Sequence, residues 1–336
     1  MSAVKFKLDL SVKPTSNSIQ YQHKTFLIGS CFTENMGIKL QHHLFDTLEN
    51  PHGILFNPVS VQNALTDYVN NKDYTASDLF LLNEVWNSWH HHSRFSGVTQ
   101  QAALEKINTS IQKAHTYLKS ANHLVITLGS AWIYELTDQA LGKAGLIVAN
   151  NHKAPSNWFT KRLLKPEELL NKLQELTSIL FAFNPNLQII FTISPVRHLR
   201  EGLVENNRSK AVLIQAVHDL VESTKQVTYF PAYELVIDDL RDYRFYAEDL
   251  VHPNYAATTY VWEKFVGSYM KPETQVIMKQ VAELQLAANH KPFFEGSLEH
   301  QKFLQSCLAK SEQLQQKYPQ LPLQNHLQFF KSQIGK

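Results

Sequence analysis

The sequence predicts a three-layer α/β/α sandwich on a mostly parallel sheet, followed by a C-terminal helical appendage. Short apolar segments rich in β-branched residues alternate with amphipathic helical patterns through most of the chain. Strands that alternate with helices imply right-handed βαβ units, which lie parallel in one sheet. After about residue 272 only helical patterns remain, and prolines interrupt them. We therefore expect an α/β domain over residues 1–271 and a helical appendage over residues 272–336.

Each expected strand is a short buried run, and each expected helix has apolar residues at helical spacing. The strands are expected at residues 25–28, 123–129, 187–194 and 227–230. The helices of the α/β domain are expected from about residue 33 to residue 44 and at residues 60–69, 100–120, 166–181, 209–224 and 254–269. A turn-rich loop is expected at residues 50–58, and a short strand or hairpin arm at residues 145–152. The appendage is expected to form helices at residues 273–289, 297–308 and 311–318.

The composition is that of an ordinary folded protein, with 43% hydrophobic and 18% charged residues in a chain of 336. A net charge of +2 gives no argument for a nucleic-acid or membrane partner. Two cysteines, Cys31 and Cys307, are too few for a disulfide framework or a cysteine-rich zinc site. Residues 1–10 alternate apolar and charged side chains and do not resemble a signal peptide, and no later stretch approaches a membrane span. A cytoplasmic location is expected.

The first candidate site lies at the end of the first strand, in the stretch TFLIGSC at residues 25–31. Gly29 ends the strand and Thr33 can cap the next helix, which places Ser30 and Cys31 on a tight strand-to-helix turn. Such a turn lies at the carboxyl edge of the sheet, where open α/β sheets bind ligands. A nucleophile there is exposed, and the helix N-terminus favours negative charge on it. We therefore expect the pKa of the Cys31 thiol to lie below that of a free thiol.

The second candidate site is the pair Asp249 and His252, just before the last helix of the α/β domain. Asp249 can accept a hydrogen bond from the His252 ring, fix its tautomer and leave the other ring nitrogen to act as a base. The same short spacing also fits an Asp that caps a helix beside a surface histidine. The combination with a Gly-Ser-Cys turn at the end of the first strand favours the catalytic interpretation.

In this order, the Gly-Ser-Cys turn and the later Asp-x-x-His resemble the SGNH/GDSL hydrolase superfamily, in which a Gly-Asp-Ser turn supplies the nucleophile. The sequence is more similar to the GSCFA family, named for its N-terminal motif, which here reads GSCFT at residues 29–33. Other stretches similar to that family are GILFNP at residues 53–58, TLGSAW at 127–132, SPVRH at 194–198 and DYRFY at 242–246. The resemblance covers about residues 26–265 and implies an SGNH-type fold with acyl-ester chemistry.

The resemblance leaves two candidates for the nucleophile. If Gly29 matches the Gly of Gly-Asp-Ser, Ser30 falls on the Asp and Cys31 falls on the nucleophile. A thiolate at a helix N-terminus beside an imidazole is a competent nucleophile, which favours Cys31. In the alternative, Ser30 carries the hydroxyl chemistry and Cys31 is a small buried hydrophobe. A third interpretation makes the whole turn structural.

The resemblance also implies hydrogen-bond donors for an oxyanion. The superfamily uses a Gly backbone N–H and an Asn side chain beside the N–H of the nucleophile. Gly53 resembles that glycine, and the Asn is expected two residues after Gly129, where Ala131 stands instead. The side chains that can replace the Asn or border the same pocket are those of Asn57, Ser130 and Asn151. Arg197 can bind a substrate carboxylate or phosphate there, or it can pair with a nearby acid.

The predicted function is hydrolysis or transfer of an acyl ester of a small molecule or a glycan. Cys31 or Ser30 attacks the carbonyl, His252 acts as base and then as acid, and Asp249 orients His252. No cofactor is expected. A metal site at the histidines of residues 90–92 is not expected, since no carboxylate stands at a fitting spacing, and surface or pocket positions suit them better. The sequence leaves the oligomeric state open.

Two alternatives belong to other functional classes. One is a ligand-binding protein that keeps the cleft and has lost turnover, which the missing Asn favours. The other is a redox sensor in which Cys31 forms a disulfide with Cys307 of the appendage.

Overall fold

The structure is a computed structural model, and it describes residues 9–335. The expectation about a signal peptide falls mostly on residues 1–8, which lie outside the described residues. Among residues 9–335, no helix is both long enough and apolar enough to cross a membrane.

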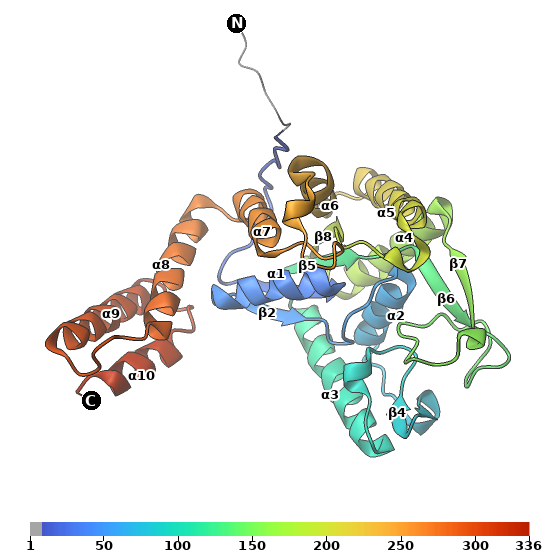
Figure 1. Cartoon of the computed structure of the whole chain (residues 1–336), viewed down its shortest axis with the longest axis horizontal. Helices are drawn as coiled ribbons and strands as arrows, with labels where there is room; N and C mark the ends of the chain where they lie inside the picture. Colours follow the sequence, from blue (N-terminus) through green and yellow to red (C-terminus); the bar gives the residue numbers. More distant parts are fainter. Residues whose placement is uncertain (1–8, 336) are drawn as a thin grey trace, which may run out of the picture.

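A five-stranded parallel sheet forms the centre of the α/β domain (Figure 1). Its strand order is β2-β1-β5-β8-β9. The strands are β1 (Lys24–Gly29), β2 (Asp46–Glu49), β5 (His123–Leu128), β8 (Gln188–Ile193) and β9 (Val227–Phe230). Ile28 of β1 lies opposite Ile126 of β5, which lies opposite Phe191 of β8. The strand order reverses between β1 and β5, and a doubly wound sheet binds ligands at the carboxyl end of that switch point.

The predicted fold class and the four predicted strands are confirmed. β2 is an additional strand at the edge of the sheet that the sequence did not indicate. Of its four residues only Leu48 is buried, and Asp46 and Glu49 at its ends are acidic, so the stretch lacks the apolar run of the central strands.

Helices cover both faces of the sheet and complete the three layers. The helices of the α/β domain are α1 (Cys31–His42), α2 (Pro58–Val69), α3 (Gln100–Lys119), α4 (Pro166–Phe183), α5 (Leu203–Ser223), α6 (Ala232–Glu234) and α7 (Tyr255–Tyr269). One face packs against α1 and α7 in an apolar cluster that includes Leu27. The other face packs against α2, α3, α4 and α5 in a cluster that includes Phe26 and Ile28. Because successive strand residues point to opposite faces, both clusters draw on β1, and its sequence is apolar throughout.

Two antiparallel hairpins extend from this sandwich: β3 (Phe80–Leu82) with β4 (Val85–Asn87), and β6 (Trp132–Leu136) with β7 (Phe159–Leu163). The stretch at residues 145–152, expected as a short strand or hairpin arm, forms no regular strand, but its first part runs antiparallel to β6 as a hairpin arm. The Leu136 N–H donates to the Leu146 carbonyl at 2.9 Å, the Val148 N–H donates to the Tyr134 carbonyl at 3.0 Å, and an isolated bridge joins Glu135 to Ile147. The short helical turns are η1 (Ala76–Asp78), η2 (Ser93–Phe95), η3 (Ser156–Trp158), η4 (Leu199–Glu201), the π-type η5 (Leu235–Leu240) and η6 (Tyr243–Phe245).

The first helix, α1, begins earlier than expected. Ser30, not Thr33, is the N-cap, because its backbone is extended and its Oγ accepts a hydrogen bond from the N–H of Phe32 at 3.3 Å. Thr33 lies inside the helix, and its N–H donates to the Ser30 carbonyl at 2.9 Å. Cys31 is therefore the first residue of α1 and not part of a free turn.

Gly29 makes this abrupt change from strand to helix possible. Its φ is +138°, and a Cβ at this position would lie 2.1 Å from the carbonyl oxygen of Thr127 on β5. Its N–H donates to Asn50 Oδ1 at 2.8 Å, and its carbonyl accepts the N–H of Leu55 at 2.9 Å. Only a residue without a side chain fits so close to a neighbouring strand, so Gly29 fixes where the chain leaves the sheet.

The C-terminal appendage consists of α8 (Pro272–Asn289), α9 (Leu298–Lys317) and α10 (Gln324–Gln333), which project from the α/β domain (Figure 1). The two helices expected at residues 297–308 and 311–318 form the single helix α9. Ser311 does not break it, because its buried hydroxyl donates to the Cys307 carbonyl one turn earlier at 2.8 Å. The third helix, α10, was not expected and buries His326 and Phe330.

The appendage is anchored at the C-terminal end of α1. The ring of His43 stacks on Trp262 of α7 with ring centroids 5.8 Å apart, and its Nδ1 lies 3.3 Å from the Met278 carbonyl oxygen on α8. Gln285 donates to the His42 carbonyl at 3.3 Å. The apolar cluster between the sheet, α1 and α7 continues into all three appendage helices.

Substitution of Gly29 by Ala is expected to destabilise the fold by about 3 kcal/mol, because the new methyl group meets a strand backbone and the φ is unfavourable. Gly267→Ala in α7 is the matched control. A Cβ there has nothing within 4 Å, so this change should be neutral or stabilise the fold by up to about 1 kcal/mol. Urea unfolding of both variants measures the difference, and equal stability would contradict the role given to Gly29.

Candidate functional site

Ser30 and Cys31 lie at the carboxyl end of β1, beside the switch point of the sheet. Ser30 is 1% exposed and its hydroxyl is used as the helix cap. Cys31 is only partly buried. The two neighbours therefore differ in exposure, since the Ser30 side chain is enclosed and Cys31 is only partly buried.

Burial raises the pKa of the Cys31 thiol above its usual value. The N–H groups of Phe32 and Cys31 and the positive charge of Lys210 act in the opposite direction, whereas the carboxylate of Glu34 adds to the effect of burial. The expected low thiol pKa is therefore wrong. The helix N-terminus does favour the thiolate, but the loss of water around the sulfur outweighs it.

Asp249 and His252 form a hydrogen-bonded pair in the loop that precedes α7. The His252 Nδ1 lies 2.6 Å from Asp249 Oδ2, and both side chains are about half exposed, at 50% and 49%. The other Asp249 oxygen accepts the N–H groups of Val251 at 2.9 Å and His252 at 3.0 Å. The His252 N–H, its ring and the Val251 N–H lower the pKa of Asp249 to about 2. The pair thus fixes the ring through Nδ1 and leaves Nε2 for another partner.

Lys210 of α5 is a further ionisable group at this edge that the sequence analysis missed. Its side chain is 1% exposed, and its Nζ donates to the carbonyls of Gly129 at 2.7 Å and Ser194 at 2.6 Å. These carbonyls directly follow β5 and β8. Burial lowers the pKa of Lys210 to about 7, and the negative charge of Cys31 acts against this shift. The one feature of the sequence that indicates a buried Lys210 is its position three residues before Leu213, on the apolar face of α5.

His198 connects this group to the His252 pair. Its Nε2 is buried and has no hydrogen-bond partner among residues 9–335. Burial lowers the pKa of His198 to about 4, with smaller contributions from the charges of Lys210 and His252. Geometry places His198 between the two groups. A Cβ on Gly129 would lie 3.2 Å from His198 Nε2, the Gly129 carbonyl accepts from Lys210, and the N–H of Arg197, the residue before His198, donates to the Val251 carbonyl at 3.4 Å.

The proposed oxyanion donors have partners inside the protein. The Gly53 N–H donates to the Asn50 carbonyl at 2.7 Å. The N–H groups of Gly129 and Ser130 both donate to the Phe56 carbonyl at 2.9 Å. The Asn57 amide donates to Ser60 Oγ at 2.9 Å and to the Val148 carbonyl at 3.4 Å. These groups organise the loops around the site, and a substrate oxygen would have to displace one of these acceptors.

A pocket of about 370 Å³ opens at the same edge, between the loops that follow β5 and β8. Four residues proposed from the sequence line it: Asn57, Ser130, Asn151 and Arg197. The other lining residues are Phe56, Trp132, Tyr134, Val148, Ala149, Asn150, His198, Leu199, Arg200 and Glu201. Gly129 lies behind this wall, since a Cβ there would be 3.2 Å from both His198 Nε2 and the Phe56 carbonyl oxygen. Gly53, Ser30, Cys31, Asp249 and His252 are not among the lining residues.

Arg197 joins the pocket to the loop of the His252 pair. Its guanidinium lies 4.2 Å from the ring centroid of Tyr246 and 5.2 Å from that of Tyr243. Its Nη1 donates to the Leu250 carbonyl at 3.3 Å. The structure pairs Arg197 with aromatic rings and a carbonyl group, and among residues 9–335 it forms no salt bridge. A substrate anion can therefore reach it without displacing a carboxylate.

Of the three histidines at residues 90–92, only His91 is buried, and the other two are partly exposed. His91 is 1% exposed and stacks on the buried His52 with ring centroids 4.0 Å apart. His92 accepts the N–H of Arg94 as the cap of η2. Within the described part of the chain, no group of three or more His, Cys, Asp or Glu side chains is arranged to hold a metal ion. Cys31 and Cys307 are both free thiols, the latter in α9.

The fold and the site define a doubly wound α/β protein with a half-buried thiol and a His–Asp pair at the carboxyl edge of its sheet. The chain belongs to the GSCFA family, whose model matches residues 24–265. Residues 281–336 match a second model, described as the C-terminal domain of GSCFA domain proteins. The sequence-based family assignment is therefore confirmed.

The comparison with curated proteins found no match. Among solved structures, the chain is similar to an acetyl xylan esterase (Est2A) from the rumen bacterium Butyrivibrio proteoclasticus, at 11% sequence identity and a TM-score of 0.38. The match covers 74% of this chain and 63% of the esterase chain, so it spans less than two thirds of that protein.

Lys210 should make the stability of the fold depend on pH. Its folded-state pKa lies below its unfolded value, so between pH 7 and 10 the unfolded chain binds more protons and rising pH favours folding. Relative to Lys210→Met, the wild type should gain about 2 kcal/mol in free energy of unfolding between pH 7 and pH 9. Urea titrations at both pH values measure this gain. The exposed-site control Lys225→Met should keep the wild-type dependence, and an unchanged dependence in Lys210→Met would contradict the assignment.

Iodoacetamide should modify Cys31 faster than Cys307, because Cys307 is 6% exposed. The thiolate is the reactive form and the pKa of Cys31 is raised, so its alkylation rate should rise about tenfold per pH unit from pH 7 to pH 9. Mass spectrometry of the two cysteine peptides over a time course gives both rates. A rate that levels off below pH 8 would show that the thiol pKa is lowered.

Proposed function

We propose that this protein hydrolyses or transfers acyl esters through a covalent thioester on Cys31. The observation that carries the proposal is the contrast at the end of β1, where Ser30 is enclosed as a helix cap and the neighbouring Cys31 is only partly buried. The His252 pair at the same edge supports it, because a thiol with a raised pKa needs a base to become a nucleophile at neutral pH.

In the proposed reaction, His252 Nε2 takes the proton of Cys31, and the sulfur attacks the ester carbonyl to form a tetrahedral intermediate. The C–O bond to the alcohol then breaks, and His252 returns the proton to the leaving alkoxide. Water or an acceptor hydroxyl attacks the thioester in the same way and restores the thiol. Asp249 holds the imidazole through Nδ1 and stabilises its protonated form.

The pocket at the same edge of the sheet supplies side chains for the rest of the substrate. Trp132 and Tyr134 offer aromatic edges, Asn150 and Asn151 offer amides, and Arg197 offers a guanidinium. This mixture suits a polar small molecule or a glycan ester better than a long apolar acyl chain.

A second candidate is a protein that binds such a ligand without turnover. The observation that favours it is the internal pairing of the expected donors at Gly53, Gly129 and Asn57. Without a free donor at the oxyanion, the barrier for acyl transfer rises by about 3 kcal/mol for each missing hydrogen bond.

A reactive acyl probe, such as p-nitrophenyl acetate, separates these candidates. The wild type should release nitrophenol and carry one acetyl group on Cys31, as measured by absorbance and by peptide mass spectrometry. Cys31→Ala should abolish labelling, and His252→Ala should slow it by about 100-fold or more.

Ser30→Ala is the matched control for the nucleophile. It should lose about 1 kcal/mol of stability, because the helix cap is removed, and still become acetylated at Cys31. Labelling that survives in Cys31→Ala and disappears in Ser30→Ala would transfer the role to Ser30. A folded wild type that no acyl ester labels would favour ligand binding without turnover.

A further inference from the structure

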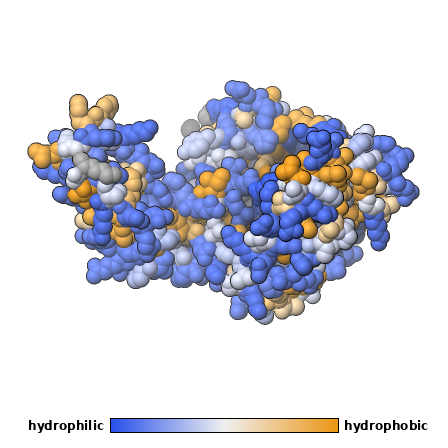
Figure 2. Space-filling view, turned by 90° about the horizontal axis from the view of Figure 1, so that it is seen from below, coloured by the Kyte–Doolittle hydropathy of each residue, from blue (hydrophilic) through white to orange (hydrophobic). Residues whose placement is uncertain are grey.

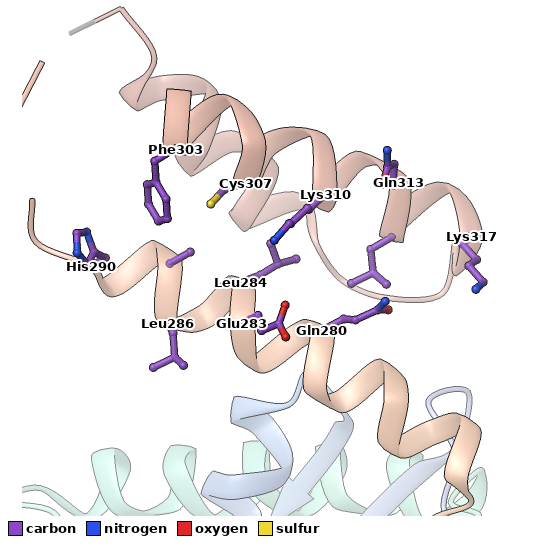
Figure 3. Close-up of a pocket in the computed structure, with 12 residues that line it drawn as sticks. Gln280, Glu283, Leu284, Leu286, His290, Phe303, Cys307, Lys310, Gln313 and Lys317 are labelled. Atoms are coloured by element: carbon purple, nitrogen blue, oxygen red, sulfur yellow. The ribbon is translucent and has the colours of Figure 1, made fainter. Parts of the chain in front are cut away.

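A second, larger hollow lies in the appendage, far along the chain from the candidate site. It has a volume of about 760 Å³ and lies between α8 and α9 (Figure 3). Its α8 wall consists of Gln280, Glu283, Leu284, Leu286, Ala287 and His290, and its α9 wall consists of Phe303, Cys307, Lys310, Gln313, Leu314 and Lys317. We call this hollow the α8–α9 groove. The third helix of the appendage, α10, contacts both helices but contributes no side chain to the groove.

The residues of the groove repeat with the spacing of a helix–helix seam. On α9, five of the six lining residues are separated by four, three, four and three residues, at positions 303, 307, 310, 314 and 317. On α8, four of the six lining residues, at positions 280, 283, 287 and 290, are separated by three, four and three residues. A helix presents such a stripe to a neighbouring helix in a coiled coil or bundle. The stripe on α9 is about 21 Å long, from 14 residues at 1.5 Å each.

The groove has an apolar floor and a partly exposed apolar rim. Leu284, Cys307 and Leu314 at its floor are buried, whereas Phe303 is 38% exposed and Leu286 is 70% exposed. Figure 2 shows the appendage as a lobe joined to the main body by a narrow waist, with apolar residues on its surface. An unfilled seam on a projecting lobe is accessible to a second helical surface.

The charges along the groove are arranged in opposite signs on its two walls. Glu283 stands on α8, and Lys310 stands on α9 at the same level of the groove (Figure 3). Neither side chain makes a hydrogen bond or ion pair within residues 9–335. The two helices run antiparallel, with His290 and Phe303 at one end of the groove and Gln280 and Lys317 at the other.

We propose that two copies of this chain associate through the α8–α9 groove and form a four-helix bundle. A two-fold axis parallel to the helices places α8 of one copy on α9 of the second and keeps each residue at its level. Glu283 then faces Lys310 of the second copy, twice in the dimer. A two-fold axis perpendicular to the helices would place α8 of one copy on α8 of the other, with the two Glu283 side chains close together. Like charges in contact are unfavourable, so the charge pattern selects the first arrangement.

Sedimentation velocity of the full chain at about 1 to 200 μM tests the proposal, since a dimer formed by mass action appears as concentration rises. Glu283→Lys and Lys310→Glu should each weaken the dimer about tenfold or more, because each creates two like-charge contacts. The double variant Glu283→Lys/Lys310→Glu should restore the wild-type dissociation constant. Lys302→Glu on α9 is the control, since Lys302 is exposed outside the groove and the same charge change there should leave the dimer unchanged.

A matched pair of variants tests the apolar part of the α8–α9 groove. Phe303→Ser should weaken the dimer, and Phe329→Ser should not, although the two rings are exposed to the same degree, 38% and 36%. Circular dichroism of each variant confirms that the helices are intact. A wild type that remains monomeric at all concentrations overturns the proposal, as does a double variant that fails to recover. Uptake of a fluorescent fatty acid by a monomer would instead assign the groove to an apolar ligand.

Discussion

The carboxyl edge of the sheet depends on one buried lysine. Lys210 reaches from α5 under the ends of β5 and β8 and holds the carbonyls of Gly129 and Ser194. An ammonium group without water around it is costly, and two carbonyl oxygens offset part of that cost. The loop after β5 is thereby fixed against Phe56, and the wall of the sheet-edge pocket follows from its position.

Burial is the largest influence on the pKa of both Cys31 and Lys210. Burial raises the pKa of the thiol and lowers that of the amine, so both shifts favour the uncharged forms. A free thiolate at the helix N-terminus is therefore not the resting state, and a base is needed. The Asp249–His252 pair is about half exposed, and Asp249 holds the ring through Nδ1, which leaves Nε2 for the base that the proposal requires.

The appendage shows how a short helical segment is stabilised by its neighbours. Three helices in about 65 residues bury too little apolar surface to fold with a large margin alone. Here their cluster is continuous with that of α1 and α7, and His43 links the two parts. This anchoring leaves the α8–α9 groove uncovered, and we propose that groove as the surface for self-association.

The sequence by itself determined the parallel α/β class, the four central strands, the family and the local Asp249–His252 pair, because these depend on periodicity and on short spacing. Contacts between distant segments decided the rest. Ser30 became the cap and Cys31 the accessible group only because β1 ends against Thr127, where Gly29 permits close approach. The raised thiol pKa, the internal partners of the expected donors and the burial of Lys210 likewise depend on packing, which adds a desolvation free energy that no local pattern contains.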